Sequence, residues 1–330
     1  MSERASVEYP VVAQRLVRRF GDIEAVSGID LSIAVGEVFG FLGPNGAGKS
    51  TTVRMLTTLL KPTEGSAQIA GHDVVEEADA VRRSIGVALQ DAAIDPLMTG
   101  RELLDLQAIL HSIPKQEGRR KSQELLATVG LTAAAERRVG TYSGGMRRRL
   151  DLALALIHEP QVLFLDEPTT GLDPNSRAAL WDEVRKLNRE RGTTVFLTTQ
   201  YMEEADQLAG RIAIIDGGKI IAEGTPAQLK AEVGDPTLRI SLAANQDRLN
   251  IETLLLDFGE PAPDAPGYVA IRLSGGAGQV ASVAVALDEA GIKVEGLELH
   301  NPTLDDVFQR ATGRRLEGAE EPSEEETASA

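Results

Sequence analysis

The chain has 330 residues, of which 42% are apolar, and it carries no cysteine and a formal net charge of −16. This length is enough for a large core and favours two domains. The charge argues against a nucleic-acid binder, and the lack of cysteine excludes disulfides and fits a reducing compartment. The apolar stretch 150–157 is interrupted by Asp151 and is far below the ~18 residues that a membrane span needs. The N-terminus lacks the apolar segment of a secretory signal.

Residues 1–40 alternate between apolar and polar types, which predicts antiparallel strands with a turn at Gly36-Glu37. Val38–Leu42 is typical of a short buried strand, and Ser50–Leu60 has helical spacing. Between them, residues 43–50 have the form G-x-x-x-x-G-K-[ST] of a phosphate loop. The strand, loop and helix follow in the order that delivers backbone N–H groups and a helix N-terminus to a phosphate chain.

The chemistry expected of this loop follows from its residue types. Gly43, Gly46 and Gly48 let the backbone curl without a Cβ clash. Lys49 would reach the β- and γ-phosphates, and the Ser50 hydroxyl would bind Mg²⁺. The loop could by itself be a coincidence of composition, because glycine is plentiful in this chain.

From residue 91 to about 159 the pattern is helical. Arg101–Leu110 and Lys121–Val129 are amphipathic, and a helix is expected from about Gly145 to Ile157, opened by the string Tyr-Ser-Gly-Gly-Met at 142–146. Backbone amides at the start of that helix would form a ready anion site. The three arginines at 147–149 are interpreted as surface residues that pair with nearby acids, and not as a phosphate clamp.

A second strand ends in two carboxylates. Four apolar residues, 162–165, are followed by Asp166 and Glu167. A buried strand would place Asp166 near the Mg²⁺ shell and Glu167 where it could polarise a water for in-line attack. The alternative is that the two acids only cap a turn.

A strand is also expected at 193–198, and Gln200 follows it. None of the four histidines follows this strand, and we interpret all four as surface or packing residues. A glutamine amide can donate a hydrogen bond to a γ-phosphate but cannot take up a proton near neutral pH. We therefore expect Glu167 to activate the water.

These motifs, in this order, resemble the ATP-binding subunits of ABC transporters from about residue 10 to 232. The string at 142–146 is similar to the family's signature motif, Gln90 takes the place of its glutamine loop, Asp173 that of its D-loop, and Phe20 that of an adenine-stacking aromatic. Two positions depart from the family's usual pattern: Met146 in the signature, and Gln200 in place of the switch histidine.

The resemblance implies a site for ATP and Mg²⁺ shared between two subunits in a head-to-tail dimer. It implies that one subunit binds ATP through Phe20, Gly43, Pro44, Asn45, Gly46, Ala47, Gly48, Lys49, Ser50, Thr51, Gln90 and Asp166. The other subunit would complete the site in trans through Tyr142, Ser143, Gly144, Gly145 and Asp173. The expected catalytic residues are Glu167, Gln200 and Lys49, and the expected metal ligands are Ser50, Gln90 and Asp166.

The last third of the chain has a different composition. Residues 234–236, Gly-Asp-Pro, indicate a boundary. Strands are expected at 237–242, 268–273 and 293–299, with helices at 247–258 and 279–290 between them and a closing helix at 304–311. This pattern predicts a small accessory α/β domain for dimerisation or regulation, or one that only stabilises the dimer. The acidic segment 314–330 is expected to be a disordered tail.

The predicted fold class is therefore α/β: a P-loop NTPase core of the ABC ATPase type with an antiparallel β subdomain and a helical signature subdomain, plus a small C-terminal α/β domain. The domains expected are 1–233, with the helical subdomain at about 91–159, then 234–313 and the tail 314–330.

The arginine-rich signature, the string Leu-Thr-Thr-Gln-Tyr-Met-Glu-Glu-Ala-Asp at 197–206 and Pro-Thr-Leu-Asp-Asp-Val-Phe at 302–308 resemble the daunorubicin-resistance type of exporter ATPase. The resemblance implies an ATPase at the cytoplasmic face of the cell membrane that drives efflux of an amphiphilic drug or lipid through a separate permease. The permease would dock near Gln90 and the loop 91–98. An importer ATPase is the nearer alternative, against which the C-terminal domain argues. A soluble ABC ATPase acting on nucleic acid is the more distant one, and we expect no nucleic-acid partner.

Overall fold

The computed structural model describes residues 8–89, 94–242, 248–262 and 268–314. The chain divides between Pro226 and Ala227 into two compact units. The helix α8, Pro226–Val233, begins at this division, and the boundary predicted at Gly234 lies at its other end. Within the described ranges, no helix is both long enough and apolar enough to cross a membrane.

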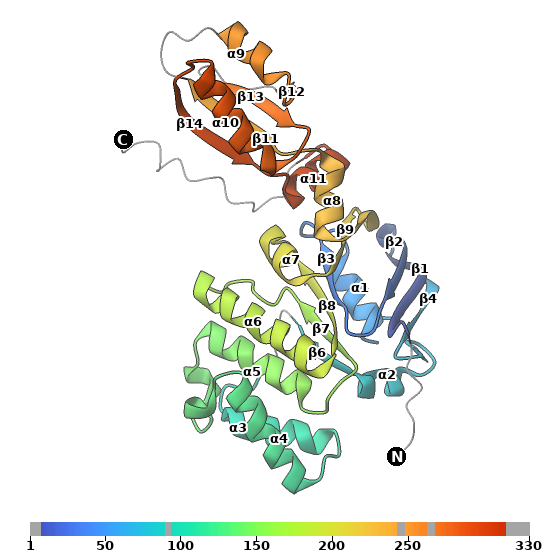
Figure 1. Ribbon diagram of the computed structural model, residues 1–330. Helices are drawn as coiled ribbons and strands as arrows, with labels where there is room; N and C mark the ends of the chain where they lie inside the picture. Colours follow the sequence, from blue (N-terminus) through green and yellow to red (C-terminus); the bar gives the residue numbers. More distant parts are fainter. Residues whose placement is uncertain (1–7, 90–93, 243–247, 263–267, 315–330) are drawn as a thin grey trace. The chain divides into compact units, whose positions relative to one another are not determined.

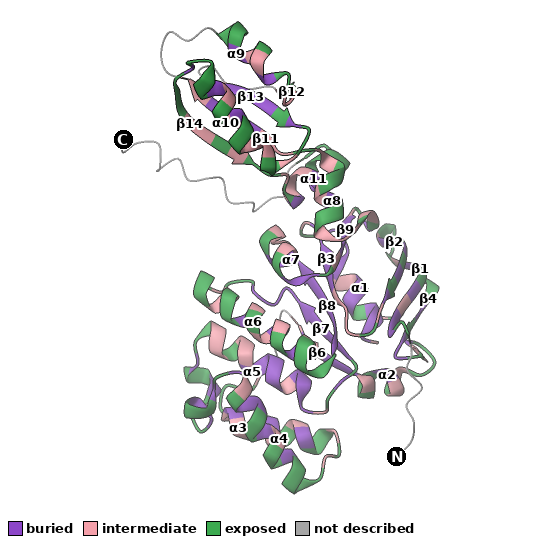
Figure 2. Cartoon of the chain, in the orientation of Figure 1, coloured by how far each residue is buried: buried purple, intermediate pink, exposed green. Residues whose placement is uncertain are grey.

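A six-stranded sheet forms the centre of the first unit (Figure 1). Its order is β10-β9-β3-β8-β7-β6, and all neighbours are parallel except β10 and β9. The strands are β3 (Val38–Leu42), β6 (Ile85–Ala88), β7 (Val162–Asp166), β8 (Thr194–Thr199), β9 (Arg211–Asp216) and β10 (Lys219–Gly224). Figure 2 shows β3, β7 and β8 buried, as expected for parallel strands covered on both faces.

A second, antiparallel sheet in the order β2-β1-β4-β5 belongs to the same unit. Its strands are β1 (Val11–Phe20), β2 (Ile23–Ile33), β4 (Glu64–Ile69) and β5 (His72–Asp73). The pairing of β1 with β2 confirms the antiparallel strands predicted before the phosphate loop. The helices α1 (Lys49–Leu56) and α2 (Ala78–Ser84) also belong to this part of the chain.

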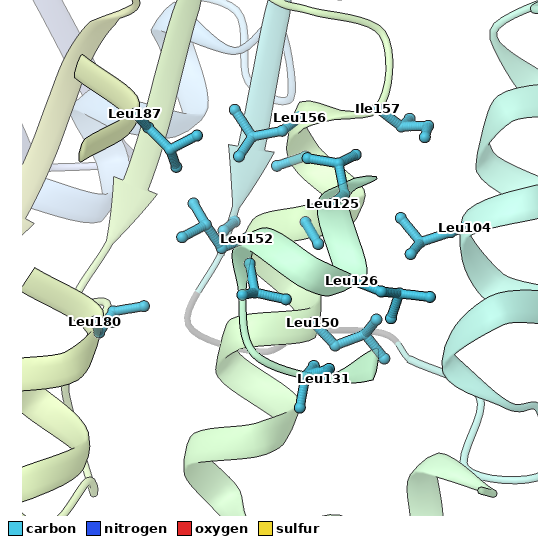
Figure 3. Close-up of a cluster of buried hydrophobic side chains, with 14 of the residues drawn as sticks. Leu104, Leu125, Leu126, Leu131, Leu150, Leu152, Leu156, Ile157, Leu180 and Leu187 are labelled. Carbon is cyan, nitrogen blue, oxygen red and sulfur yellow. The ribbon is translucent and has the colours of Figure 1, made fainter. Parts of the chain in front are cut away.

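The predicted helical subdomain contains α3 (Gly100–Leu110), α4 (Lys115–Thr128) and α5 (Gly144–Leu156). Its leucines pack together and extend to α6 (Pro174–Arg191), as Figure 3 shows for Leu104, Leu126, Leu150 and Leu180. The helix α7 (Met202–Leu208) follows β8. The helix starts are fixed locally: Thr99 and Glu102 form a capping box on α3, and Ser143 caps α5 by accepting from the Met146 amide at 3.2 Å.

The large sheet separates two apolar cores because its strand residues alternate between its faces. Leu163 and Leu165 pack with the leucines of the helical subdomain. Phe164 and Phe196 point to the other face, where they pack with α1 and the antiparallel sheet. There the Phe196 ring lies 5.5 Å from the Phe164 ring, centroid to centroid. The two cores hold the phosphate-loop strand and the strand before Asp166 at fixed places in one sheet.

The described part of the second unit contains an antiparallel sheet in the order β12-β13-β11-β14 and, besides α8, the α-helices α9, α10 and α11. The strands β11 (Thr237–Leu242), β13 (Tyr268–Leu273) and β14 (Val294–His300) and the helices α9 (Arg248–Leu255), α10 (Val280–Glu289) and α11 (Leu304–Thr312) match the predicted elements. The strand β12 (Gly259–Ala262) was missed because it contains Gly259 and Pro261, which are unfavourable in strands. The β-α-β-β-α-β order is ferredoxin-like.

We expect Phe196→Ala to lower the free energy of unfolding of the first unit by about 3–5 kcal/mol, because it would leave a cavity between three rings. Phe20→Ala, at a ring that is 46% exposed, should cost less than about 1 kcal/mol. Urea unfolding followed by fluorescence of the single tryptophan, Trp181, measures both. Equal losses in the two variants would contradict the placement of Phe196 in the core.

Candidate nucleotide-binding site

The phosphate loop connects the end of β3 to the start of α1, as predicted. Gly46 and Gly48 adopt left-handed backbone angles, with φ of 80° and 108°. A Cβ at Gly43 would lie 2.3 Å from the Ile215 carbonyl oxygen, and one at Gly48 would lie 2.5 Å from that of Ala25. Close backbone approach therefore requires glycine at Gly43, and both close approach and conformation require it at Gly48.

Lys49, the first residue of α1, is only 4% exposed. Its ammonium donates to the carbonyls of Gly43 at 2.7 Å and Pro44 at 3.0 Å, and lies 3.2 Å from Glu167 Oε1. Burial lowers the pKa of Lys49, and the nearby Glu167 carboxylate opposes that shift. The ammonium is thus held inside the curl of the loop, beside the predicted base.

Asp166, the last residue of β7, joins the loop to the neighbouring strand. Its Oδ1 accepts from the Ser50 hydroxyl at 3.2 Å and from the Thr198 hydroxyl of β8 at 2.5 Å. Asp166 is 3% exposed, so it sits at the buried end of the parallel strands. The sequence reasoning did not single out Thr198, although its place in the strand before Gln200 was a signal that could have found it.

Glu167 has a left-handed backbone with φ of 48°, which is costly for a residue with a Cβ. Its amide donates to both the carbonyl and the hydroxyl oxygen of Thr198, at 3.1 and 3.0 Å. Its Oε2 accepts from the Thr170 hydroxyl at 3.3 Å. The neighbouring strand therefore holds Glu167 in a strained conformation, with its carboxylate turned toward Lys49.

The predicted trans residues form a second group around the start of α5. Ser143 caps that helix, and a Cβ at Gly145 would meet the Ser176 hydroxyl oxygen of α6 at 2.8 Å. Asp173 caps α6 by accepting from the Ser176 amide at 3.0 Å and from its hydroxyl at 2.6 Å. Among the described residues, no hydrogen bond or ion pair joins this group to the phosphate loop.

The remaining predicted site residues occupy varied positions. Phe20 ends β1 with an exposed ring, and the Arg18 guanidinium lies 4.5 Å from its centre. Tyr142 is only 4% exposed, and its hydroxyl donates to the Ala134 carbonyl at 2.6 Å, so its ring belongs to the core of the helical subdomain.

Gln200 follows β8 and is half-buried. Gln90 lies outside the described residues. The remaining loop positions are exposed at Asn45, half-buried at Pro44 and Thr51, and buried at Ala47.

Arg148 corrects the interpretation of the three arginines as surface residues. Its side chain is 11% exposed, and its guanidinium donates to the carbonyls of Leu89 at 2.6 Å, Asp166 at 2.9 Å and Pro168 at 2.9 Å. It also pairs with Asp151 at 3.2 Å. No local pattern predicts these contacts, because the partners are backbone atoms of distant segments.

Comparison with known proteins identifies the class of protein that this fold and site define. Residues 26–170 match the ABC transporter family. The daunorubicin resistance ATP-binding protein DrrA3 of Streptomyces coeruleorubidus is 50% identical over 92% of this chain and 96% of its own length. The chain therefore belongs to the ABC transporter ATP-binding proteins and carries their ATPase domain, as the motifs predicted.

Within that family, the similar ATP-binding proteins are named for different roles. The doxorubicin resistance ATP-binding protein DrrA of Mycobacterium tuberculosis strain H37Rv is 44% identical over 88% of this chain and 89% of its own. The Nod factor export ATP-binding protein I of Burkholderia pseudomallei is 39% identical over 93% and 98%. These alignments extend through the second unit, so that unit is shared with the relatives.

Solved structures match the first unit. CbiO1 from Clostridium perfringens, part of an ABC transporter complex, superposes with a TM-score of 0.64 at 27% identity, over 68% of this chain and 92% of that one. A dimeric ATP-binding cassette in a post-hydrolysis state with ADP and Pi gives 0.60 at 29% identity, over 65% and 98%. The predicted ABC ATPase fold is confirmed.

Burial raises the pKa of Asp151 to about 6, against the opposing effect of Arg148. Between the ordinary value of 3.8 and about 6, the folded chain binds a proton that the unfolded chain does not. Stability therefore falls as the pH rises through this window, by at most about 1.4 kcal/mol per pH unit. The difference in urea unfolding free energy between wild type and Asp151→Asn should follow this slope from pH 4 to 6 and flatten above it. A difference that does not change with pH would contradict the assignment.

Proposed function

We propose that this chain is the ATP-hydrolysing subunit of an exporter that drives efflux of a hydrophobic or amphiphilic small molecule through a separately encoded permease. The observation that carries the proposal is the convergence of Lys49, Ser50, Asp166 and Glu167 at the end of the parallel sheet. The named roles of the relatives in drug resistance and Nod factor export support the direction of transport.

In this proposal the loop residues bind the triphosphate. The Lys49 ammonium lies 3.2 Å from the Glu167 carboxylate. A γ-phosphate bound beside that carboxylate would compete with it for the Lys49 ammonium. The amides around Gly46 and Gly48 and the start of α1 provide donors and a positive dipole end. The exposed ring of Phe20 would stack on adenine.

The oxygens at the loop fit Mg²⁺. Ser50 Oγ and Asp166 Oδ1 lie 3.2 Å apart, and hard divalent cations prefer hydroxyl, carboxylate and phosphate oxygens. We propose both as ligands, together with Gln90. The bound ion would neutralise charge on the β- and γ-phosphates. Thr198 would hold Asp166 in the orientation that this requires.

Glu167 is proposed as the base. Its carboxylate would take a proton from the water whose oxygen attacks the γ-phosphorus, while the bond to the bridging oxygen breaks and ADP leaves. Gln200, at the end of the adjacent strand β8, would donate to the γ-phosphate without changing its protonation. The double hydrogen bond from the Glu167 amide to Thr198 fixes the backbone from which the base acts.

The signature group would complete the site of a second copy, or of a homologous ATPase subunit, in trans. The N-terminus of α5, at Ser143, Gly144 and Gly145, would bind a phosphate. Ser176 lies against Gly145 and donates a hydrogen bond to Asp173, which places Asp173 beside this helix start. The backbone of Tyr142 would take part, since its ring is buried. A dimeric relative of this fold has been solved with ADP and Pi, which supports this arrangement.

The permease is proposed to dock at a groove of about 480 Å³ next to Leu89. It is lined from both sides, by Leu59 and Val87 near the sheet and by His111 and Leu154 from the helical subdomain. Apolar side chains near a groove of this size fit an amphipathic helix of a partner. We therefore place the chain at the cytoplasmic face of the cell membrane, bound to the permease, with no nucleic-acid partner.

Glu167→Gln should lower ATP turnover by about 10²–10⁴-fold, since the amide cannot accept the proton. It should leave ATP binding intact and trap a dimer that forms on addition of ATP. Phosphate release and light scattering, for wild type and variant side by side, measure the two effects. Full turnover in the variant would contradict the proposal that Glu167 is the base.

Leu59→Glu should reduce co-purification of the permease by about tenfold, because it would replace an apolar contact of the docking groove with a charge that must lose its water on binding. Leu59 is 60% exposed, so folding and ATP hydrolysis of the isolated chain should be unchanged. Val35→Glu, at a side chain with the same 60% exposure outside the groove, is the matched control. Equal co-purification of both variants would remove the groove from the proposal.

A further inference from the structure

The side chain of Arg148 binds backbone atoms of segments that lie far from it in the sequence. Its guanidinium nitrogens donate to three carbonyls, those of Leu89, Asp166 and Pro168. The last two lie on either side of Glu167. The first belongs to the residue directly before Gln90 and follows the end of β6. One side chain therefore holds the chain on both sides of the proposed base and at the end of the neighbouring strand.

The chemistry of arginine suits this task. A guanidinium is planar, always charged and offers five donors in a rigid fork, so it can bind several carbonyls at once. Burial lowers the pKa of Arg148, and the Asp151 carboxylate 3.2 Å away opposes that shift in part. An exposed arginine would not lose its water in this way. The hydrogen bonds from Arg148 to the three carbonyls must therefore offset the cost of burying its charge. The side chain of Arg149, the next residue, donates to the Val129 carbonyl at 3.0 Å, within the helical subdomain, and to no other group among the residues that the structure describes.

The helix that carries Arg148 is held firmly. Leu150, Leu152 and Leu156 of α5 are each at most 2% exposed and pack among the leucines shown in Figure 3. Close packing of this kind transmits displacement, because side chains cannot slide past one another without opening voids. A shift of the α5 N-terminus at Ser143 would therefore move the guanidinium of Arg148 with it.

We propose that Arg148 is a positioning residue that couples the two ATP sites of the dimer. Ser143 and the amides beside it engage the ATP bound to the partner, while Arg148 fixes the backbone around Glu167 of the same chain. Engagement of one ATP thus sets the base that acts on the other. The inference rests on the proposed function, because it requires the trans arrangement of the signature.

The position of Trp181 provides a direct probe of this region. Its Nε1 donates to Glu204 Oε1 at 3.1 Å. Burial raises the pKa of Glu204, while hydrogen bonds, the one from Trp181 among them, and more weakly the Arg148 charge oppose that shift. Trp181 is the only tryptophan of the chain. Its emission therefore reports on this buried region without any label and without hydrolysis.

The test compares the full-length wild type with Arg148→Met, which keeps the packing but removes the donors, Arg148→Lys, which keeps the charge, and Arg149→Met as the matched control. ATP affinity is measured by equilibrium dialysis, dimerisation by light scattering in the Glu167→Gln background, and turnover by phosphate release. Trp181 emission is recorded on addition of ATP.

For Arg148→Met we expect ATP affinity and dimerisation within about twofold of wild type, kcat lowered by about tenfold at similar KM, and loss of the ATP-induced Trp181 change. Arg148→Lys should recover part of kcat, and Arg149→Met should behave as wild type. The proposal is overturned if Arg148→Met keeps its kcat, or if affinity and dimerisation fall in parallel with it, which would mean a structural role alone. If the wild type itself binds no ATP or does not dimerise, the proposed function fails first and this inference with it.

Discussion

The first unit depends on how the carboxylate of Asp166 is held. Two parallel strands place it beside Thr198, and the phosphate loop brings Ser50 to the same oxygen. A buried carboxylate needs such partners, because leaving it unsatisfied would cost several kcal/mol. The sheet, the loop and the first turn of α1 are thus tied together at the point where a nucleotide would bind.

The strain at Glu167 follows from the same arrangement. A left-handed backbone at a residue with a side chain persists only where its surroundings enforce it. Here the amide is bound twice by Thr198, the side chain by Lys49 and Thr170, and the flanking carbonyls by Arg148. The strained backbone of Glu167 is therefore held through its amide, its side chain and its two neighbours, which suits the residue proposed as the base.

The helical subdomain extends this logic. The helix α5 begins at the signature motif. Arg148, in its second turn, binds backbone carbonyls at the ends of the strands, and the leucines that follow pack in the core of the helical subdomain. In the proposed dimer, its start would meet one nucleotide and its second turn would hold the residues around the other. A helix is suited to such a connection, since its backbone is stiff and its buried face leaves little freedom. The second unit has a core of its own.

The sequence by itself determined the phosphate loop, the strand before Asp166, the start of α5 to within a residue and nearly every element of the second unit, because periodicity and glycine spacing are local properties. It did not determine the start of α4, which begins at Lys115 and not at Lys121. The sequence did not predict β12, because Gly259 and Pro261 are unfavourable in strands and the strand forms through its pairing with β13. Only the tertiary structure decided that Tyr142 is core, that Thr198 holds Asp166 and that Arg148 is buried. Each of these depends on contacts between segments far apart in the chain, whose partners are backbone atoms or neighbouring strands that no local pattern encodes.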